Sequence, residues 1–454
     1  MTKITVRIFT LVLAVFLLLG SLSGCGGKGD GNDSSKSDMK MGDSSIELPE
    51  LEITGDKVLY LCWDDPASLK TTSTWHYAIN EKMKEAYGCE LEFVQTTYEN
   101  LPVKATQMVL SGNSPDLIFY KQQDNPLFIL NDIVQPVDQY VDFKSPLWKD
   151  VKELNDQFRI NGKLYLPVTG FGNNAYTYYW TQELENLGLE SPRDLYKKGE
   201  WTYKKLEEYA VKLTKKSSTG EVEVYGTAFA DYFRLSTGVD IVKNENGVYS
   251  NNLRDPKMAD FMNYAQNLTY DLKVRSLNGD DSNLFLQGKV AIYLYEQWFK
   301  SSLQKQLKAG EIDWAPAPKW DDADKNYAAG RLSGAWVAKG AKNPGGAMAF
   351  LSIERLTRVD TATKKSMRER DTMLSGADQE DFDLAEEMED TKKFTLILGE
   401  DASMGSAWGN TKRFELSNQT LNWQKPWATG VEEFYPLLDA GVKEINDKLA
   451  DYKK

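Results

Sequence analysis

Histidine and cysteine, two residue types that often perform catalysis, are scarce in this chain of 454 residues. It has one histidine, His76, and three cysteines, Cys25, Cys62 and Cys89. A nucleophile activated by histidine would therefore depend on His76 alone, and three cysteines indicate neither a disulfide framework nor a zinc site. The sequence contains no nucleophile-elbow, zinc-protease or phosphate-loop motif. We therefore predict a protein without a metal, without a cofactor and without enzymatic activity.

Aromatic, carboxylate and amide side chains gather instead where predicted strands end. Trp63 and Asp64 follow one apolar run, and Tyr120, Gln122 and Gln123 follow another. A carboxylate can accept hydrogen bonds from two neighbouring hydroxyl groups, and an indole can lie against the apolar C–H face of a sugar ring. These residue types therefore indicate a site for a polyhydroxylated ligand. The alternatives are that Asp65-Pro66 simply starts the next loop or helix and that the second stretch is an exposed polar turn, and both interpretations stay open.

Alternating strands and helices between residues 57 and 120 would position these side chains. Apolar runs predict the strands, Thr74 and Gly88 predict the two ends of the first helix, and an apolar stripe predicts the second helix. This alternation is typical of an α/β lobe with a parallel sheet, in which ligands bind beyond the carboxyl ends of the strands. The expected strands are 57–65, 89–95 and 114–120, and the expected helices are 75–87 and 101–109.

A second lobe of the same class is expected from about residue 165. Thr202 can cap one helix, and Asp255-Pro256 can begin another, with Pro in the first turn. The stretch 326–340 then has the pattern of a strand that crosses back toward the first lobe. The length of the chain also favours two lobes, because one hydrophobic core rarely grows to this size.

The apolar run GKVAIYLYEQW (288–298) predicts a buried strand of the second lobe. It ends in Glu296 and Trp298, and a tryptophan at the polar end of a strand fits a ligand cleft better than a core. Trp298 is therefore the leading single candidate for ligand contact. Trp336, after Gly334, is a weaker candidate, because the strand that contains it fits a buried hinge as well.

The amino terminus has the features of an export signal. Lys3 and Arg7 precede an apolar run of 12 residues (8–19), which is shorter than the roughly 20 residues that a membrane-spanning helix needs. The run ends in Leu22-Ser23-Gly24-Cys25, which resembles the bacterial lipobox, where the cysteine receives a diacylglyceryl group. Two acyl chains would hold the mature protein stably on a membrane. The alternative is a signal peptide cut nearby, with Cys25 incidental.

The residues that follow Cys25 are rich in Gly, Ser and Asp and poor in apolar side chains. Such a stretch cannot bury enough apolar surface to offset the entropy of ordering it, so it predicts a flexible tether up to about residue 54.

The net charge of −13 argues against nucleic acid as a partner, because phosphate binding depends on clustered Lys and Arg. Residues 378–390 carry eight acidic side chains, which we interpret as a solvated face and not as a calcium site.

Cys62 and Cys89 are expected near opposite ends of two parallel neighbouring strands. A separation of about a strand length, roughly 13 Å, is well beyond the reach of a disulfide. We therefore predict that both thiols are reduced, buried and structural.

Four segments in the same order resemble the extracellular solute-binding proteins of family 1, the sugar-binding components of ABC importers. They correspond to an NGKxYxxP segment, a YNKxLFxxxGLxxP…TWxE block, an FxxGKxAMxxxGxW strand and a return strand with a KNPExAxxFLxFL helix. The matching segments are INGKLYLPV (160–168), YYWTQELENLGLESP with WTYKKLEEYAVKLT (178–214), FLQGKVAIYLYEQW (285–298) and GRLSGAWVAKGAKNPGGAMAFLSIERL (330–356).

The resemblance implies a periplasmic-binding-protein-like fold of type II, with two mainly parallel α/β lobes that close over a ligand about a hinge. It implies a carbohydrate ligand, ABC permease subunits as partners, a monomer, and a lipid-anchored location on the extracytoplasmic face of the cell membrane. The expected divisions are 1–24 (lipoprotein signal peptide), 25–54 (flexible tether), 55–164 (first part of the N-terminal lobe), 165–325 (C-terminal lobe), 326–375 (return to the N-terminal lobe and hinge) and 376–454 (C-terminal helices packing across the lobes).

The resemblance also implies roles for particular residues. In the maltose-binding branch of the family, the loop that corresponds to Gln122 and Gln123 contacts the sugar. Asp231 and Tyr232 lie in a stretch similar to one that supplies an aromatic platform there, and Trp298 aligns with the stacking tryptophan of the family. Other tryptophans could line the cleft or pack between helices, namely Trp180, Trp408, Trp423 and Trp427.

The leading hypothesis is a membrane-anchored protein that captures an oligosaccharide by hinge closure and delivers it to an ABC permease. One alternative is a surface glycosidase, although no sequence pattern singles out the pair of carboxylates that such an enzyme needs. Another alternative is a sensor component that presents its ligand to a membrane receptor.

Overall fold

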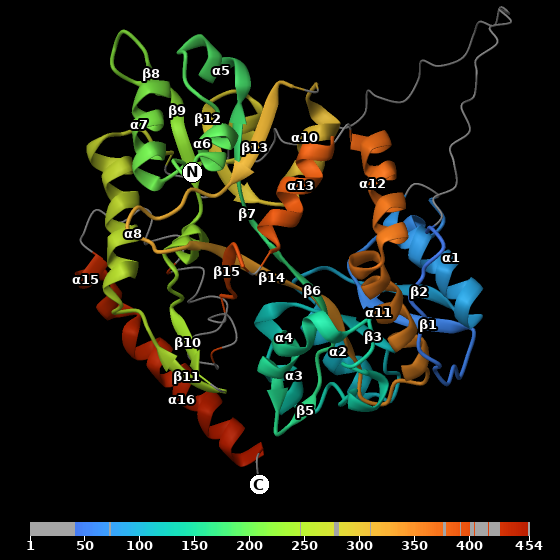
Figure 1. The fold of residues 1–454 in the computed structure, drawn as a ribbon. Coiled ribbons are helices and arrows are strands. Elements are labelled where there is room, and N and C mark those ends of the chain that lie inside the picture. Colours follow the sequence, from blue (N-terminus) through green and yellow to red (C-terminus); the bar gives the residue numbers. More distant parts are fainter. Residues whose placement is uncertain are drawn as a thin grey trace, which may run out of the picture. The chain divides into compact units, whose positions relative to one another are not determined.

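Two large β-sheets with their flanking helices form the framework of the described part of the chain, and two small two-stranded sheets, β4-β5 and β10-β11, accompany them (Figure 1). The structure is a computed structural model, and the described residues belong to one compact unit. It describes residues 41–71, 74–245, 247–276, 281–308, 310–375, 378–390, 392–399, 404, 416 and 427–452. The predicted signal peptide, Cys25, the part of the predicted tether before residue 41, and Trp408 and Trp423 therefore lie outside the described residues. Residues 41–54 were also expected to be tether, but they contact the first lobe, where the backbone N–H of Thr54 donates to the Asn343 side chain at 3.2 Å.

The first sheet has six strands. Across the sheet they are β15 (Phe394–Ile397), β14 (Asn326–Val337), β3 (Leu117–Phe119), β1 (Lys57–Cys62) and β2 (Glu90–Gln95), and β6 (Val168–Asn173) also pairs with β14. Strand β1 pairs in parallel with both β2 and β3, whereas β14 runs antiparallel to β3. The three predicted parallel strands and the predicted return of the chain through 326–340 are therefore confirmed.

Helices α1 (Trp75–Tyr87), α2 (Leu101–Leu110) and α11 (Pro344–Val359) belong to the lobe that contains this sheet. The hydroxyl of Thr74 accepts a hydrogen bond from the backbone N–H of Tyr77 at 3.1 Å, and Gly88 has a φ of 68°. These two features begin and end α1 as predicted, because the hydroxyl satisfies a free N–H and glycine adopts the left-handed conformation without strain.

The second sheet has five strands of mixed direction. Across the sheet they are β13 (Ile312–Pro316), β7 (Ala175–Trp180), β12 (Val290–Glu296), β9 (Val222–Phe229) and β8 (Lys215–Lys216). In this sheet β12 and β9 pair in parallel, and the other three neighbouring pairs are antiparallel. The sheet is less parallel than expected. Strand β7 enters directly from β6 and β13 leads directly back to β14, so the neighbours β7 and β13 must run in opposite directions.

Helices α7 (Tyr203–Leu213) and α8 (Pro256–Gln266) cover the second sheet and begin as predicted. The side chain of Thr202 accepts from the backbone N–H of Lys205, and that of Asp255 accepts from Lys257. Helix α7 lies very close to β9, where Gly226 provides the space: a Cβ atom at this position would lie 1.9 Å from the carbonyl oxygen of Ala210.

Within the described residues, the chain passes directly between the two sheets from β6 to β7 and from β13 to β14 (Figure 1). The last helix, α16 (Tyr435–Tyr452), touches residues of both lobes. Its Asn446 side chain donates to the carbonyl of Tyr249 at 2.8 Å, and the hydroxyl groups of Tyr452 and Tyr165 are 2.7 Å apart. Within the described ranges, no helix is both long enough and apolar enough to cross a membrane.

Cys62 and Cys89 are free thiols in the core of the first lobe. The parallel register pairs Cys62 with Gln95, so Cys89, which precedes β2, lies at the opposite end of the strand pair. Burial raises the pKa of Cys62 to about 12, which keeps this thiol protonated. The prediction of two reduced, buried cysteines is confirmed.

The remaining elements are short or lie at the periphery of the two sheets. They are β4 (Arg159–Ile160), β5 (Lys163–Leu164), β10 (Val242–Glu245), β11 (Val248–Asn251), α3 (Leu127–Leu130), α4 (Lys152–Gln157), α5 (Thr181–Asn186), α6 (Pro192–Lys197), α9 (Ser282–Leu286), α10 (Phe299–Gln306), α12 (Thr361–Ser375), α13 (Gln379–Met388), α15 (Trp427–Gly430), η1 (Pro66–Leu69), η2 (Gln122–Asp124), η3 (Asp138–Tyr140), η4 (Lys149–Val151), η5 (Asp231–Thr237), η6 (Asn267–Asp271) and η8 (Val431–Glu433).

Candidate functional site

Trp63 lies directly after β1 in a group of aromatic side chains. Its ring centroid is 3.8 Å from that of Phe119 on β3 and 4.8 Å from that of Tyr98, which follows β2. The parallel order of β2, β1 and β3 brings these three residues to one edge of the sheet. The ring of Trp63 is only partly buried, so this edge combines a packed aromatic base with surface open to solvent.

Asp64 is partly exposed beside the single histidine of the chain. Its Oδ2 is 3.7 Å from Nε2 of His76, and Nδ1 of His76 is 3.2 Å from the hydroxyl of Ser68. Burial lowers the pKa of His76, although the charge of Asp64 opposes this shift. At 3.7 Å the carboxylate does not orient the ring by a hydrogen bond, as a catalytic triad would require. Asp64 therefore remains available to accept hydrogen bonds from a ligand.

The loop after β3 contains buried charges that the sequence analysis did not single out. Lys121 and Asp124 are 4% and 6% exposed. Burial lowers the pKa of Lys121, and it raises the pKa of Asp124 to about 7, although the Lys121 ammonium opposes the second shift. Gln123 accepts a hydrogen bond from the hydroxyl of Tyr98 at 3.2 Å. Tyr120 is buried, with its ring centroid 5.5 Å from that of Trp336.

Trp298 lies at the end of β12 in the second lobe, and 46% of its surface is exposed. Its indole N–H donates to the Glu296 carboxylate at 2.8 Å, and its ring makes edge contacts with Tyr295 and Phe299. The backbone N–H of Gln297 is 3.4 Å from the side-chain oxygen of Asn174, between β6 and β7. Trp298 is therefore close to the segment that joins the lobes.

Three other aromatic candidates are placed differently. Trp336 is fully buried and packs near Tyr120 and Phe128, so in this structure it belongs to the core and offers no surface to a ligand. Trp427 is also buried, and the Trp180 indole donates to the carbonyl of Phe285 at 3.1 Å. Asp231 and Tyr232 begin η5, as the position after β9 predicts, but their side chains are outside the described part of the structure.

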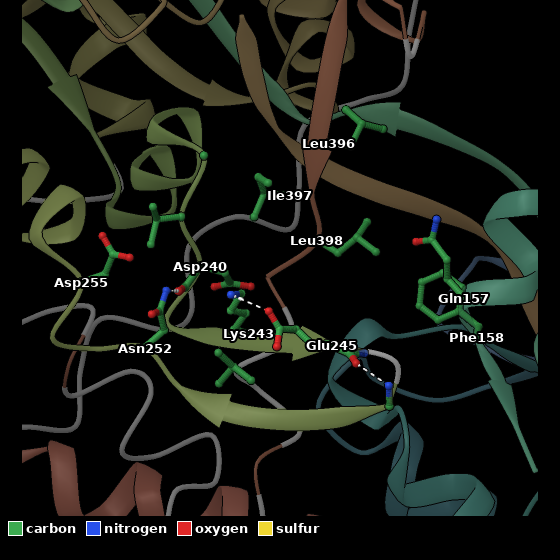
Figure 2. A pocket seen from close by; sticks show the side chains of 15 residues that line it. Gln157, Phe158, Asp240, Lys243, Glu245, Asn252, Asp255, Leu396, Ile397 and Leu398 are labelled. Carbon is green, nitrogen blue, oxygen red and sulfur yellow. Dashed lines mark hydrogen bonds and ion pairs between the residues drawn. The ribbon is translucent and has the colours of Figure 1, made fainter. Parts of the chain in front are cut away.

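A separate cavity of about 740 Å³ lies elsewhere in the molecule (Figure 2). Figure 2 shows Gln157 and Phe158 on one side, Asp240, Asn252 and Asp255 on the other, and the end of β15 between them. None of the ten candidate ligand residues lines it, and the sequence analysis did not anticipate it. Its lining residues are Gln157, Phe158, Gly238, Val239, Asp240, Val242, Lys243, Asn244, Glu245, Gly247, Asn252, Asp255, Leu396, Ile397 and Leu398.

The acidic segment 378–390 is largely helix α13, and it is not simply a solvated face. Asp381 accepts hydrogen bonds from Arg193 at 2.8 Å and from the Trp314 indole at 2.7 Å, and it lies 3.5 Å from the ammonium of Lys300. These contacts of Asp381 attach α13 to the second lobe. Five of the eight acidic residues are exposed, as expected of a solvated face, namely Asp378, Glu380, Asp383, Glu386 and Glu389. The described residues contain no group of three metal-ligating side chains.

The structure has the architecture of a two-lobed binding protein of type II. Two β-sheets with flanking helices are connected through β6–β7 and β13–β14, and aromatic and polar side chains lie at the strand ends. The chain belongs to the family of bacterial extracellular solute-binding proteins, whose family model matches residues 66–352. The resemblance in the sequence and the expected fold class are therefore confirmed. Among curated protein sequences, none matches this chain significantly.

Solved structures share this fold at low sequence identity. The GacH receptor of Streptomyces glaucescens, studied without ligand and with acarbose, is 17% identical with a TM-score of 0.61, covering 87% of this chain and 99% of its own. An ABC substrate-binding protein of Listeria monocytogenes in complex with cycloalternan is 16% identical, with a TM-score of 0.61 and the same coverage. The lacto-N-biose complex of a binding protein from Bifidobacterium longum is 16% identical, with a TM-score of 0.62, covering 88% of this chain and 99% of its own.

Proposed function

We propose that this protein is a membrane-anchored solute-binding protein that captures an oligosaccharide by hinge closure and delivers it to an ABC permease. Cys25 carries the lipid anchor, and the protein works as a monomer on the extracytoplasmic face of the cell membrane. The ligand binds between the strand ends of the two lobes, and no chemical step is needed for this role.

The observation that carries the proposal is the pairing of Trp298 and Glu296 at the end of β12. The indole is 46% exposed, although burying so large an apolar side chain is normally favourable. The Glu296 carboxylate accepts from the indole N–H and has further lone pairs for hydroxyl groups. An apolar ring face beside a carboxylate matches a sugar, which presents a C–H face and hydroxyl groups together.

The first lobe offers a similar combination. Trp63 is partly exposed next to the Asp64 carboxylate, at the edge where the carboxyl ends of β1, β2 and β3 meet. Three proteins with the same fold have been solved in complex with acarbose, cycloalternan and lacto-N-biose, all of which are carbohydrates. These ligands support the substrate class, and the particular sugar is a question for measurement.

The cavity in Figure 2 is a less suitable sugar site than the strand ends. It is lined by one aromatic residue, Phe158, which is 8% exposed and therefore presents almost no ring face. Lys243 and Glu245 in its wall form an ion pair at 2.6 Å, which already occupies part of its polar surface. Variants in this cavity therefore serve as controls for variants at the strand ends.

Titration calorimetry on the purified full-length chain in detergent tests the proposal. We expect at least one of maltotetraose, cellotetraose, xylotetraose and lacto-N-biose to bind, and Trp298→Ala to weaken binding by about tenfold or more. Trp298→Phe should lose less, and Lys243→Ala, in the cavity, should bind like the wild type. Absence of binding to all four sugars, or equal loss with Lys243→Ala, would count against the proposed site and function.

A further inference from the structure

Tyr98 lies in the short loop between β2 and α2 and was not a candidate from the sequence. We propose that Tyr98 is the aromatic platform of the first lobe, against which one pyranose unit of the oligosaccharide stacks, and that buried Lys121 is the positioning residue that holds it there. This inference rests on the proposed function and adds to it a specific ligand contact.

The exposure of the Tyr98 ring supports this proposal. Among the described residues, the large apolar side chains that are well exposed include only two aromatic ones, Tyr98 at 40% and Trp298 at 46%. Single exposed aliphatic side chains are ordinary, but these two rings each follow the carboxyl end of a strand, one in each lobe. A ligand that binds at the strand ends of both lobes would cover both rings.

Three neighbouring residues fix the position of the Tyr98 ring. The Lys121 ammonium is 4.0 Å from the ring centroid and donates a hydrogen bond to the backbone carbonyl of Tyr98 at 2.8 Å. The ring meets Trp63 edge to face at a centroid distance of 4.8 Å, and its hydroxyl donates to Gln123 at 3.2 Å. A ring held in this way loses little conformational entropy when a ligand covers it, which favours binding.

Lys121 lowers the stability of the fold at this position, because its charge is buried. Lys121 is 4% exposed, and no carboxylate of the described residues forms an ion pair with its ammonium group within 4.0 Å. Asp124, three residues later, acts on it only at longer range. A methionine would fill the same space without a buried charge, so the lysine is better explained by its contacts with Tyr98 than by stability.

The chemistry of the neighbouring groups indicates the kind of ligand. Tyr98 supplies an aromatic surface, Gln123 an amide next to the phenol hydroxyl, and Asp64 a carboxylate after the adjacent strand. Amide and carboxylate groups bind hydroxyl groups well, and an aromatic face binds C–H groups. A neutral pyranose unit satisfies all three, whereas an acidic sugar would be repelled by Asp64.

Calorimetry with the same four sugars tests the inference on the full-length chain. We expect Tyr98→Ala to weaken the affinity for any sugar that the wild-type protein binds, by about tenfold or more. The affinity of Tyr98→Phe should stay within about threefold of wild type, because the ring is retained. Val103→Ala, at an exposed position of α2, is the matched control and should leave the affinity unchanged. Lys121→Met should weaken the affinity without lowering the melting temperature, and Lys121→Arg should restore part of it.

The results separate this inference from the function on which it rests. If the wild-type chain binds none of the four sugars, the proposed function fails and the inference fails with it. If wild type binds and Tyr98→Ala binds equally well, the platform is refuted while the proposed function stands. If Lys121→Met lowers stability and leaves affinity unchanged, Lys121 is a structural residue and its positioning role is refuted.

Discussion

Asp124 is a carboxyl group in the interior of the first lobe, one turn after the strand end that carries the proposed platform. It is 6% exposed, and no described residue donates a hydrogen bond to its Oδ2. Burial raises its pKa from 3.8 to about 7, against the opposing charge of Lys121. The folded protein therefore holds this proton more tightly than the unfolded chain does, and the group lowers stability progressively as the pH rises from about 4 to 7.

The raised pKa of Asp124 leads to a prediction for Asp124→Asn. The rise from 3.8 to about 7 corresponds to at most roughly 4 kcal/mol of lost stability above pH 7. The amide cannot ionise, so we expect the variant to be about 2–4 kcal/mol more stable than wild type at pH 8, with the difference shrinking toward zero near pH 4. Urea unfolding at both pH values measures it. A variant that is less stable at pH 8 would show that the carboxylate has a favourable partner.

Some residues of the proposed site could be predicted from the sequence and others could not, for identifiable reasons. Trp298 could be predicted because an apolar run ends at it, and the structure places it at a strand end with an exposed ring. Tyr98 could not be predicted, because its contacts with Trp63 and Lys121 depend on three strands lying side by side. Trp336 was ambiguous from its sequence context, and the structure buries it in the core.

The contact between α7 and β9 shows how a single glycine determines the packing of two elements. A Cβ atom at Gly226 would lie 1.9 Å from the Ala210 carbonyl oxygen, and backbone cannot move aside as a flexible side chain can. We expect Gly226→Ala to lower the free energy of unfolding by about 2–3 kcal/mol or more, because α7 must shift away from the sheet. Urea unfolding at constant pH measures this loss.

Gly55 provides the matched control, because a Cβ atom there would meet nothing within 4 Å. Gly55→Ala should change stability by about 0.5 kcal/mol or less. Equal effects of the two substitutions would show that the close approach of α7 and β9 relaxes at little cost.

Elements with strong local signals could be predicted, and the pairing of strands could not. The caps at Thr74, Thr202 and Asp255 begin helices as expected, because capping depends on neighbours three residues apart. The mixed direction of the second sheet depends on where the chain enters and leaves that lobe, which no local pattern encodes. The contacts of Asp381 with the second lobe were missed for the same reason.

For the whole molecule, the order of four segments predicted two lobes with crossing strands, and the family model and the fold agree with it. The cavity of about 740 Å³ could not be predicted, because its walls come from parts of the chain around residues 157, 240 and 397. Such a cavity depends on how distant segments pack, and composition and periodicity contain no information about that.

The proposed attachment to the membrane also concerns the whole molecule. We expect Cys25→Ala to abolish lipid attachment, so that the protein, processed or not, no longer carries the diacylglyceryl mass. Metabolic labelling with a radioactive or clickable fatty acid, followed by membrane fractionation, measures this directly. Labelling of the variant at wild-type level would contradict the assignment of Cys25, and Cys62→Ala is a control that should keep its label.

The central claim is that the protein binds an oligosaccharide and leaves it intact. Equilibrium dialysis of the full-length chain against the four sugars, followed by mass spectrometry of the retained sugar, tests it most directly. The account predicts that at least one sugar is retained at about one molecule per chain, with unchanged mass and full recovery. Retention of none, or recovery of shortened products that indicate hydrolysis, would contradict it.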